Sequence, residues 1–194
     1  MSGFRGTQNE LLYSSAVAAT ALGTFTTEDN LMKGMPTCKL PDLAQLFPKV
    51  GADSSSLKFR ALGQASATST PTYTFSLRAL TSNTWTAGGI LLGSSNACTC
   101  VSGVTNGIWQ VDLDIVVRTL AVPGTATITV VCGGTVTGSA FTSASNSIPA
   151  AGTSPAVTTL DMTAQYYLFL SAACSASSAS NTINTQLVKL YGEN

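Results

Sequence analysis

The chain has 194 residues, of which only 9% are charged, with nine basic and nine acidic side chains and no histidine. The length fits one domain, and the scatter of the nine cations excludes the clustered Lys and Arg face that binds nucleic acid. The missing histidine excludes Ser-His-Asp and Cys-His catalysis and imidazole metal sites. Because so few charges keep the surface soluble only weakly, the composition favours a surface covered by partner subunits.

Residues 1–50 are expected to supply N-terminal strands and a short helical turn at Pro41–Pro48. The apolar run Leu11–Gly23 superficially imitates a signal peptide, but Glu10 precedes it and two serines interrupt it, so we interpret it as a strand. No run approaches the ~20 apolar residues of a membrane span, and we expect a soluble protein that is not exported by this route. Residues 1–34 suit either an arm that reaches a neighbouring subunit or the first two strands of the sandwich.

Residues 51–194 alternate between apolar and polar side chains, as half-buried strands do. In "SLKFRALG", for example, Leu57 and Phe59 share one face while the basic residues occupy the other. Ser139–Pro155 is rich in Ser, Ala and Pro and is expected to form a loop. The other segments of this kind, bounded by Gly, Pro, Asn or Ser, are "PTYTFSLRAL", "GGILLGS", "IWQVDLDIVVRTL", "TATITVVCGGTVTG", "QYYLFLSAACS" and "NTINTQLVKLY". About eight strands with one polar face predict an all-β, antiparallel jelly-roll-like sandwich that forms a single domain overall.

Asp112 and Asp114 are the candidates for an acid/base pair. Two residues apart on a strand, their carboxylates are about 7 Å from each other. That spacing suits an inverting glycosidase, whose carboxyl groups lie ~6.5–9.5 Å apart. The favoured interpretation is cross-strand ion pairing with Arg78, Arg60 or Lys58, because opposite charges on neighbouring strands ordinarily stabilise sheets. We therefore predict no catalytic residue and expect the protein not to be an enzyme.

No metal, phosphate or cofactor site is predicted. Glu28 and Asp29 are expected in a turn, and Gly88-Gly89 and Gly133-Gly134 lack the Lys-Ser/Thr of a phosphate loop, so both glycine pairs are interpreted as bulges or tight bends. The cysteines are odd in number and lack zinc-ribbon spacing, so we expect free, buried or semi-buried thiols at Cys38, Cys98, Cys100, Cys132 and Cys174.

Several segments, covering nearly the whole chain, carry a family resemblance. They are "NELLYSSAVAATALGTFTTEDNLM", "LKFRALGQASATSTPTYTFSLRAL", "SGVTNGIWQVDLDIVVRTLAVPGTATITV" and "TAQYYLFLSAACSASSASNTINTQLVKLYGEN". In these segments the chain resembles a family of small proteins encoded among the virion structural genes of tailed bacteriophages. It departs from the family at Tyr166-Tyr167, where such proteins often carry a tryptophan, and in the insert Ser139–Pro155.

The resemblance implies a jelly-roll-like virion protein. We expect a capsid decoration protein that binds the major capsid protein or other virion proteins after assembly in the bacterial host cytoplasm. A symmetric homo-oligomer is expected, with a trimer favoured because capsid lattices have local threefold axes, and without nucleic acid, membrane or cofactor. The alternative is a fibre or tail-tip component that binds host carbohydrate through Tyr166, Trp85 or a loop, although one tyrosine of the Tyr166-Tyr167 pair must point inward on a strand.

Overall fold

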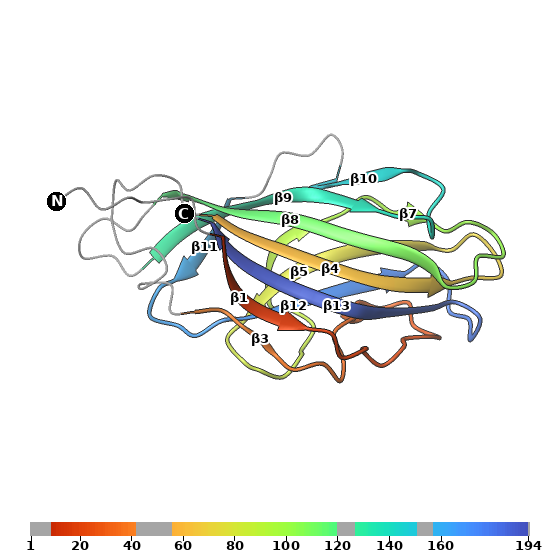
Figure 1. Cartoon of the computed structure of the whole chain (residues 1–194), viewed down its shortest axis with the longest axis horizontal. Coiled ribbons are helices and arrows are strands. Elements are labelled where there is room, and N and C mark those ends of the chain that lie inside the picture. The colour runs from red at the N-terminus through yellow and green to blue at the C-terminus, as the bar shows by residue number, and fades with distance from the viewer. Residues whose placement is uncertain (1–8, 42–55, 120–126, 151–156, 194) are drawn as a thin grey trace.

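The computed structural model describes residues 9–41, 56–119, 127–150 and 157–193, which form an elongated β-sandwich (Figure 1). These residues contain thirteen strands in two antiparallel sheets, which confirms the predicted all-β sandwich. All of the expected helical turn except Pro41 lies outside the described residues. Within the described chain, no helix is long and apolar enough to cross a membrane.

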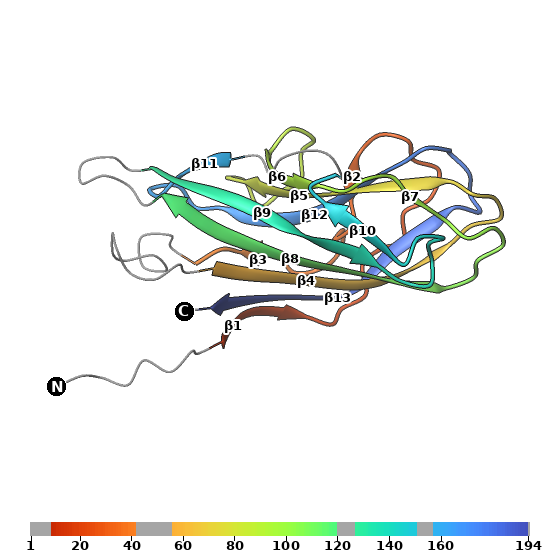
Figure 2. The same cartoon turned by 90° about the horizontal axis from the view of Figure 1, so that it is seen from above.

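The larger sheet has seven strands that run along the long axis of the molecule (Figure 2). Its order is β1-β13-β4-β8-β9-β10, and β11 pairs with a different stretch of β9 from the one that β10 occupies. The strand bounds are Asn9–Ser15 for β1, Thr182–Glu193 for β13, Ser56–Ser66 for β4 and Gly107–Thr119 for β8. They are Thr127–Thr137 for β9, Ser145–Ile148 for β10 and Val157–Asp161 for β11.

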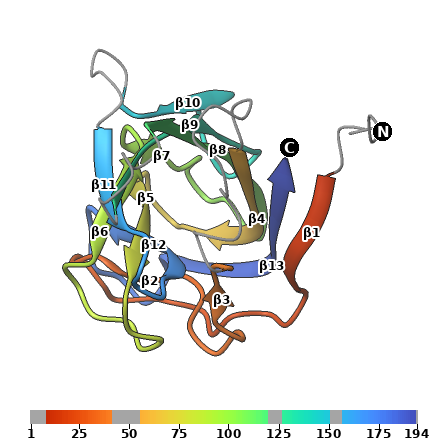
Figure 3. The same cartoon turned by 90° about the vertical axis from the view of Figure 1, so that its left-hand side faces the viewer.

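The smaller sheet has six strands and packs face to face with the first (Figure 3). Its order is β2-β12-β5-β6, with β3 paired to β12 and β7 paired to β5. The strand bounds are Asp29–Asn30 for β2, Tyr167–Cys174 for β12, Thr72–Leu80 for β5, Ile90–Ser94 for β6, Cys38–Lys39 for β3 and Cys98–Thr99 for β7.

The strand order is that of a jelly roll. When β1, β2, β4, β5, β6, β8, β12 and β13 are numbered one to eight, the sheets follow the orders 1-8-3-6 and 2-7-4-5. The frame has the predicted number of strands, but it includes β2, where a turn was expected, and leaves out β9, which was predicted as a strand. The remaining strands are the short β3 and β7, and β9 to β11, which extend the larger sheet beyond β8.

The prediction of a loop throughout Ser139–Pro155 is wrong for Ser145–Ile148, which forms β10. This strand pairs with β9 from Ser145 opposite Thr137 to Ile148 opposite Gly134. Its polar sequence carries little strand signal, so pairing with β9 and burial of the Ile148 side chain hold it in place.

The core lies between the two sheets and follows the predicted alternation. Phe59, Phe75, Trp109 and Leu113 are at most 1% exposed. The rings of Phe75 and Trp109 lie 5.2 Å apart across the two sheets. Gly63 of β4 leaves room for this packing, because a Cβ there would lie 2.3 Å from the Trp109 ring.

The described residues among the first 50 pair with both sheets of their own chain. β1 lies beside β13, with Asn9 opposite Glu193, and β2 and β3 pair with β12. The Tyr13 hydroxyl donates a hydrogen bond of 2.6 Å to the carbonyl of Pro36, which links β1 to the segment that connects β2 and β3.

Candidate functional site

The predicted acidic pair lies on the outer face of the seven-stranded sheet. Asp112 is opposite Arg60 and Asp114 is opposite Lys58 on the neighbouring strand β4. Arg60 Nε lies 3.2 Å from a carboxylate oxygen of Asp112, and Lys58 Nζ lies 3.9 Å from one of Asp114. The expected cross-strand ion pairs are therefore confirmed for these two bases. Arg78 was also considered as a partner, which is wrong, because β5 belongs to the other sheet.

Arg78 instead forms an ion pair with Glu28 on the outer face of the six-stranded sheet. Arg78 Nε and Nη2 donate to the two carboxylate oxygens of Glu28 at 2.6 and 2.7 Å. The two side chains are only 17% and 22% exposed. Burial by itself would raise the pKa of Glu28, but hydrogen bonds from Arg78 and Ser171 and the positive charge of Arg78 outweigh it, so the pKa lies below its ordinary value.

The Glu28–Arg78 ion pair connects three parts of the chain. Arg78 Nη1 also donates to the carbonyl of Gly89 at 2.8 Å, which holds the end of the β5–β6 loop, residues 81–89. The Ser171 hydroxyl on β12 contacts both the Glu28 carboxylate and the carbonyl of Ser76. The residues before β2 and the β5–β6 loop are thus fixed to the same two central strands, β5 and β12.

Between these two fixed segments lies a pocket of about 380 Å³. Phe169 of β12 is 4% exposed and contributes an aromatic ring to the pocket. The Trp85 ring, from the β5–β6 loop, lies 5.7 Å from the Phe169 ring at an angle of 56°. The other lining residues are Asp29, Asn30, Met32, Lys33, Gly34, Met35, Pro36, Thr37, Asn83 and Thr84. We call this pocket the Trp85 pocket.

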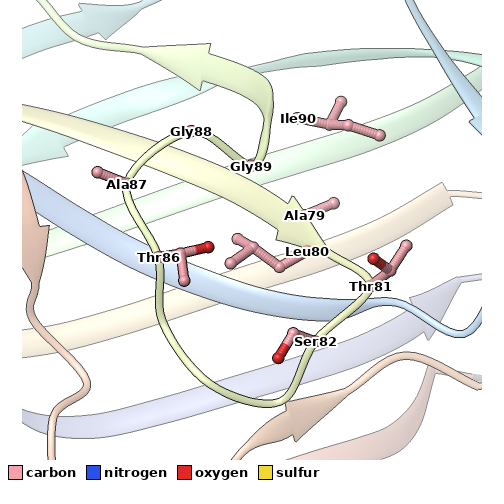
Figure 4. Close-up of a pocket in the computed structure, with 9 residues that line it drawn as sticks. All are labelled: Ala79, Leu80, Thr81, Ser82, Thr86, Ala87, Gly88, Gly89 and Ile90. Carbon is pink, nitrogen blue, oxygen red and sulfur yellow. The ribbon is translucent and has the colours of Figure 1, made fainter.

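A second pocket, of about 360 Å³, lies at the base of the same loop (Figure 4). The loop curves around the Leu80 side chain, which contacts Gly89 closely enough that a Cβ on that glycine would lie 2.4 Å away. This second pocket is lined by Ala79 to Ser82 and Thr86 to Ile90, which carry no charge and no aromatic ring. It therefore offers fewer groups for recognition than the Trp85 pocket.

Tyr166, which was considered as a sugar-stacking residue, is 3% exposed. Its hydroxyl accepts a hydrogen bond of 3.0 Å from the backbone N–H of Asp161. Tyr167 is half-buried, so one tyrosine of the pair points inward as expected. Tyr166 thus has no ring face available to a ligand, and that candidate role is wrong.

All five cysteines are buried and free, as predicted. Burial raises the pKa of Cys38 and that of Cys132 to about 12, so neither is a reactive thiolate at neutral pH. In the described residues, no three His, Cys, Asp or Glu side chains are grouped as a metal site requires.

The sequence indicates Trp85 as a candidate for ligand binding, but it does not single out Glu28, Phe169 or the polar residues of β2. Glu28 and Asp29 were expected in a turn, whereas Asp29 begins β2 and Glu28 precedes it. Glu28 and Arg78 are 50 residues apart in the chain, so no short motif links them. The one available signal was an outward-facing arginine in β5 with no acidic residue on its own strand.

The fold and the pocket define a jelly-roll β-sandwich with a small aromatic and polar cavity on one outer face. No family model matches the sequence, and no curated protein matches it. Among solved structures, the chain is similar to the CBM2 module of the evolved Dit of Lactobacillus casei BL23 phage J-1. The two are 9% identical over 97% of each chain, with a TM-score of 0.33. A score this low does not establish a shared topology.

Proposed function

We propose that this protein is a non-enzymatic structural component of a tailed-bacteriophage virion, and more specifically a capsid decoration protein that binds and stabilises the head lattice. The family resemblance in the sequence supports the virion assignment. The observation that carries the assembly role is the composition of the outer face of the seven-stranded sheet.

Four charges on that face neutralise each other in the Lys58–Asp114 and Arg60–Asp112 pairs. Lys189 of β13 lies opposite Arg60 in the register and adds a cation where an acidic group of a partner would fit. A partner can cover such a face without leaving any of these four charges buried and unpaired, whereas burial of an isolated charge is costly.

The neighbouring row of the same face is uncharged and partly apolar. It consists, in register, of Leu187, Leu62, Gln110 and Thr137. Ile108, near the start of β8, is 49% exposed. Aliphatic side chains mixed with hydroxyl and amide groups gain from burial and can also hydrogen-bond across an interface.

The proposed partners are the major capsid protein or another virion protein and further copies of this chain. A homotrimer is the proposed state, because it matches the local threefold axes of a capsid lattice. The proposal includes no nucleic acid, membrane or cofactor.

Cryo-microscopy of intact particles tests the location. Density for this chain on the head surface is expected, whereas density confined to the tail or fibres would refute decoration and leave the tail alternative. Particles assembled without the protein should break at lower temperature or lower osmotic stress.

The interface itself is tested with Ile108→Arg, which puts a charge on the proposed contact face. Val17→Arg is the matched control, since Val17 is 54% exposed and lies outside the strands of both sheets. We expect only Ile108→Arg to prevent binding to particles that lack the protein, with both variants folded by circular dichroism. Equal binding by both variants would refute this face as the contact surface.

A further inference from the structure

We propose that the Trp85 pocket binds a neutral hexopyranose, either a free sugar or the terminal unit of a glycan. This role is separate from assembly through the seven-stranded sheet, because the Trp85 pocket lies on the outer face of the opposite sheet.

The two tryptophans of the chain occupy contrasting places. Trp109 is 0% exposed in the core, whereas Trp85 is half-buried in the β5–β6 loop at the pocket. A large ring that remains partly in water, next to the ring of Phe169, provides an apolar surface for a ligand. The C–H groups on one face of a pyranose ring form a flat apolar patch of the same kind.

The polar side of the pocket has both an acceptor and a donor available. One carboxylate oxygen of Asp29 accepts the backbone N–H of Asn30 at 2.7 Å, and the side-chain oxygen of Asn30 accepts that of Met32 at 2.8 Å. Within the described residues, the other Asp29 oxygen and the Asn30 amide N–H₂ are not engaged by another group. Both residues line the pocket, and because consecutive side chains of a strand point to opposite faces, they can bind separate hydroxyl groups of a sugar and not one adjacent pair.

Charge and size favour a single neutral ring. Asp29 and Lys33 are the charged residues of the lining, so the formal charges of the pocket sum to zero. A neutral lining offers no net attraction to an anion or a cation. The volume of about 380 Å³ is at the low end of the ~300–1,000 Å³ typical of ligand pockets, which suits one sugar unit.

The pocket is preformed, which lowers the entropic cost of binding. The Glu28–Arg78 ion pair fixes the residue before β2, and the bond from Arg78 to the Gly89 carbonyl fixes the loop that bears Trp85. On the β2 side, the backbone N–H of Leu31 donates to the carbonyl of Leu170 at 2.9 Å. Both sides are therefore held before a ligand arrives.

The two indole N–H signals provide the test, with ¹⁵N-labelled protein titrated separately with D-glucose, D-galactose, D-mannose and N-acetyl-D-glucosamine at millimolar concentrations. At least one sugar should shift the Trp85 signal and leave the buried Trp109 signal in place. Methyl glycosides and matching disaccharides are titrated in parallel. They distinguish binding of a free sugar from binding of the terminal unit of a glycan.

Variants then locate the site. Trp85→Ala should weaken binding about tenfold, with part of the affinity kept in Trp85→Phe. Asp29→Asn keeps the acceptor for the Asn30 N–H and should weaken binding by removing the charged acceptor. Leu91→Ala, on the same sheet but outside the lining, should bind as the unaltered protein does. The proposal is overturned if no sugar shifts the Trp85 signal, or if Trp85→Ala binds as well as the unaltered protein.

Discussion

Replacing Glu28 by glutamine probes the ion pair that holds both sides of the Trp85 pocket. The carboxylate receives two charge-assisted hydrogen bonds from Arg78, at 2.6 and 2.7 Å, from side chains that are 22% and 17% exposed. Glutamine keeps the shape and one acceptor oxygen but presents an N–H₂ group to the guanidinium. The arginine charge then lacks its partner in a largely desolvated place.

The expected cost in the free energy of unfolding is about 2 kcal/mol, because a hydrogen bond to a charged group contributes ~1.5–3 kcal/mol and one acceptor survives. For a chain of this length that corresponds to a fall in Tm of about 4–8 °C. Asp114→Asn is the matched control, since it also removes one carboxylate charge from an ion pair. That pair is longer, at 3.9 Å, and 53% and 43% exposed, so its loss should cost less than about 0.5 kcal/mol.

The effect of Glu28→Gln should also depend on pH. The pKa of Glu28 in the folded protein lies below the ordinary value of 4.5, because the contributions of Arg78 and Ser171 outweigh burial. As pH falls, the unfolded chain takes up the proton first. The stabilisation by this carboxylate is therefore complete above the unfolded pKa and is lost as pH falls through the folded pKa.

Thermal unfolding followed by circular dichroism from pH 7 to about pH 3 measures both effects. The difference in Tm between the unaltered protein and Glu28→Gln should be largest at neutral pH and should narrow in acid. A difference that is the same at every pH, or no larger than that for Asp114→Asn, would refute the assignment of a stabilising, partly desolvated ion pair.

Three further variants or probes test other parts of the structure. Gly63→Ala should lower the free energy of unfolding, measured in urea, by about 3 kcal/mol, because its Cβ would lie 2.1 Å from a backbone carbonyl oxygen and 2.3 Å from the Trp109 ring. Gly133→Ala is the control, since the nearest atom to its Cβ would be 3.6 Å away, and it should cost less than about 1 kcal/mol. Equal costs for the two variants would contradict the packing around Gly63. The five buried cysteines should react with Ellman's reagent at pH 8 only after unfolding, since burial excludes the reagent and raises the pKa of Cys38, for example, to about 12. Rapid labelling of the folded protein would show that at least one thiol is accessible. Asp112→Asn should change the free energy of unfolding by less than about 1 kcal/mol but should weaken particle binding, because it leaves Arg60 unpaired on the proposed contact face. A glycosidase activity that this variant abolishes would contradict the non-enzymatic proposal.

Much of the sandwich could be predicted because its long strands follow a period of two. In β4 and β8, the apolar residues Phe59 and Leu113 fall on one face and the charged residues Arg60 and Asp112 on the other, as expected. The alternation is local information, since each residue's direction depends only on its place in the strand. Pairing of Asp112 with a base on an adjacent strand follows from the same rule.

The sequence was less informative where pairing, rather than pattern, creates a strand. β10 is polar and short, and it exists because β9 provides hydrogen-bond partners for it. The glycines Gly133 and Gly134 were expected to form a bulge or bend, yet they lie within β9 in continuous register with Asp114 and Leu113. Gly134 is needed for close approach instead, since a Cβ would lie 2.0 Å from the Asp112 carbonyl oxygen.

By itself, then, the sequence determined the all-β class, the inward faces of the long strands and the burial of the cysteines, because each depends on local alternation or on the apolar character of a side chain. Only the tertiary structure decided which distant groups meet. Glu28 reaches Arg78 across 50 residues, and Trp85 meets Phe169 from a strand much later in the chain. Such contacts depend on how the strands are ordered in the sheets, and no short stretch of sequence encodes that order.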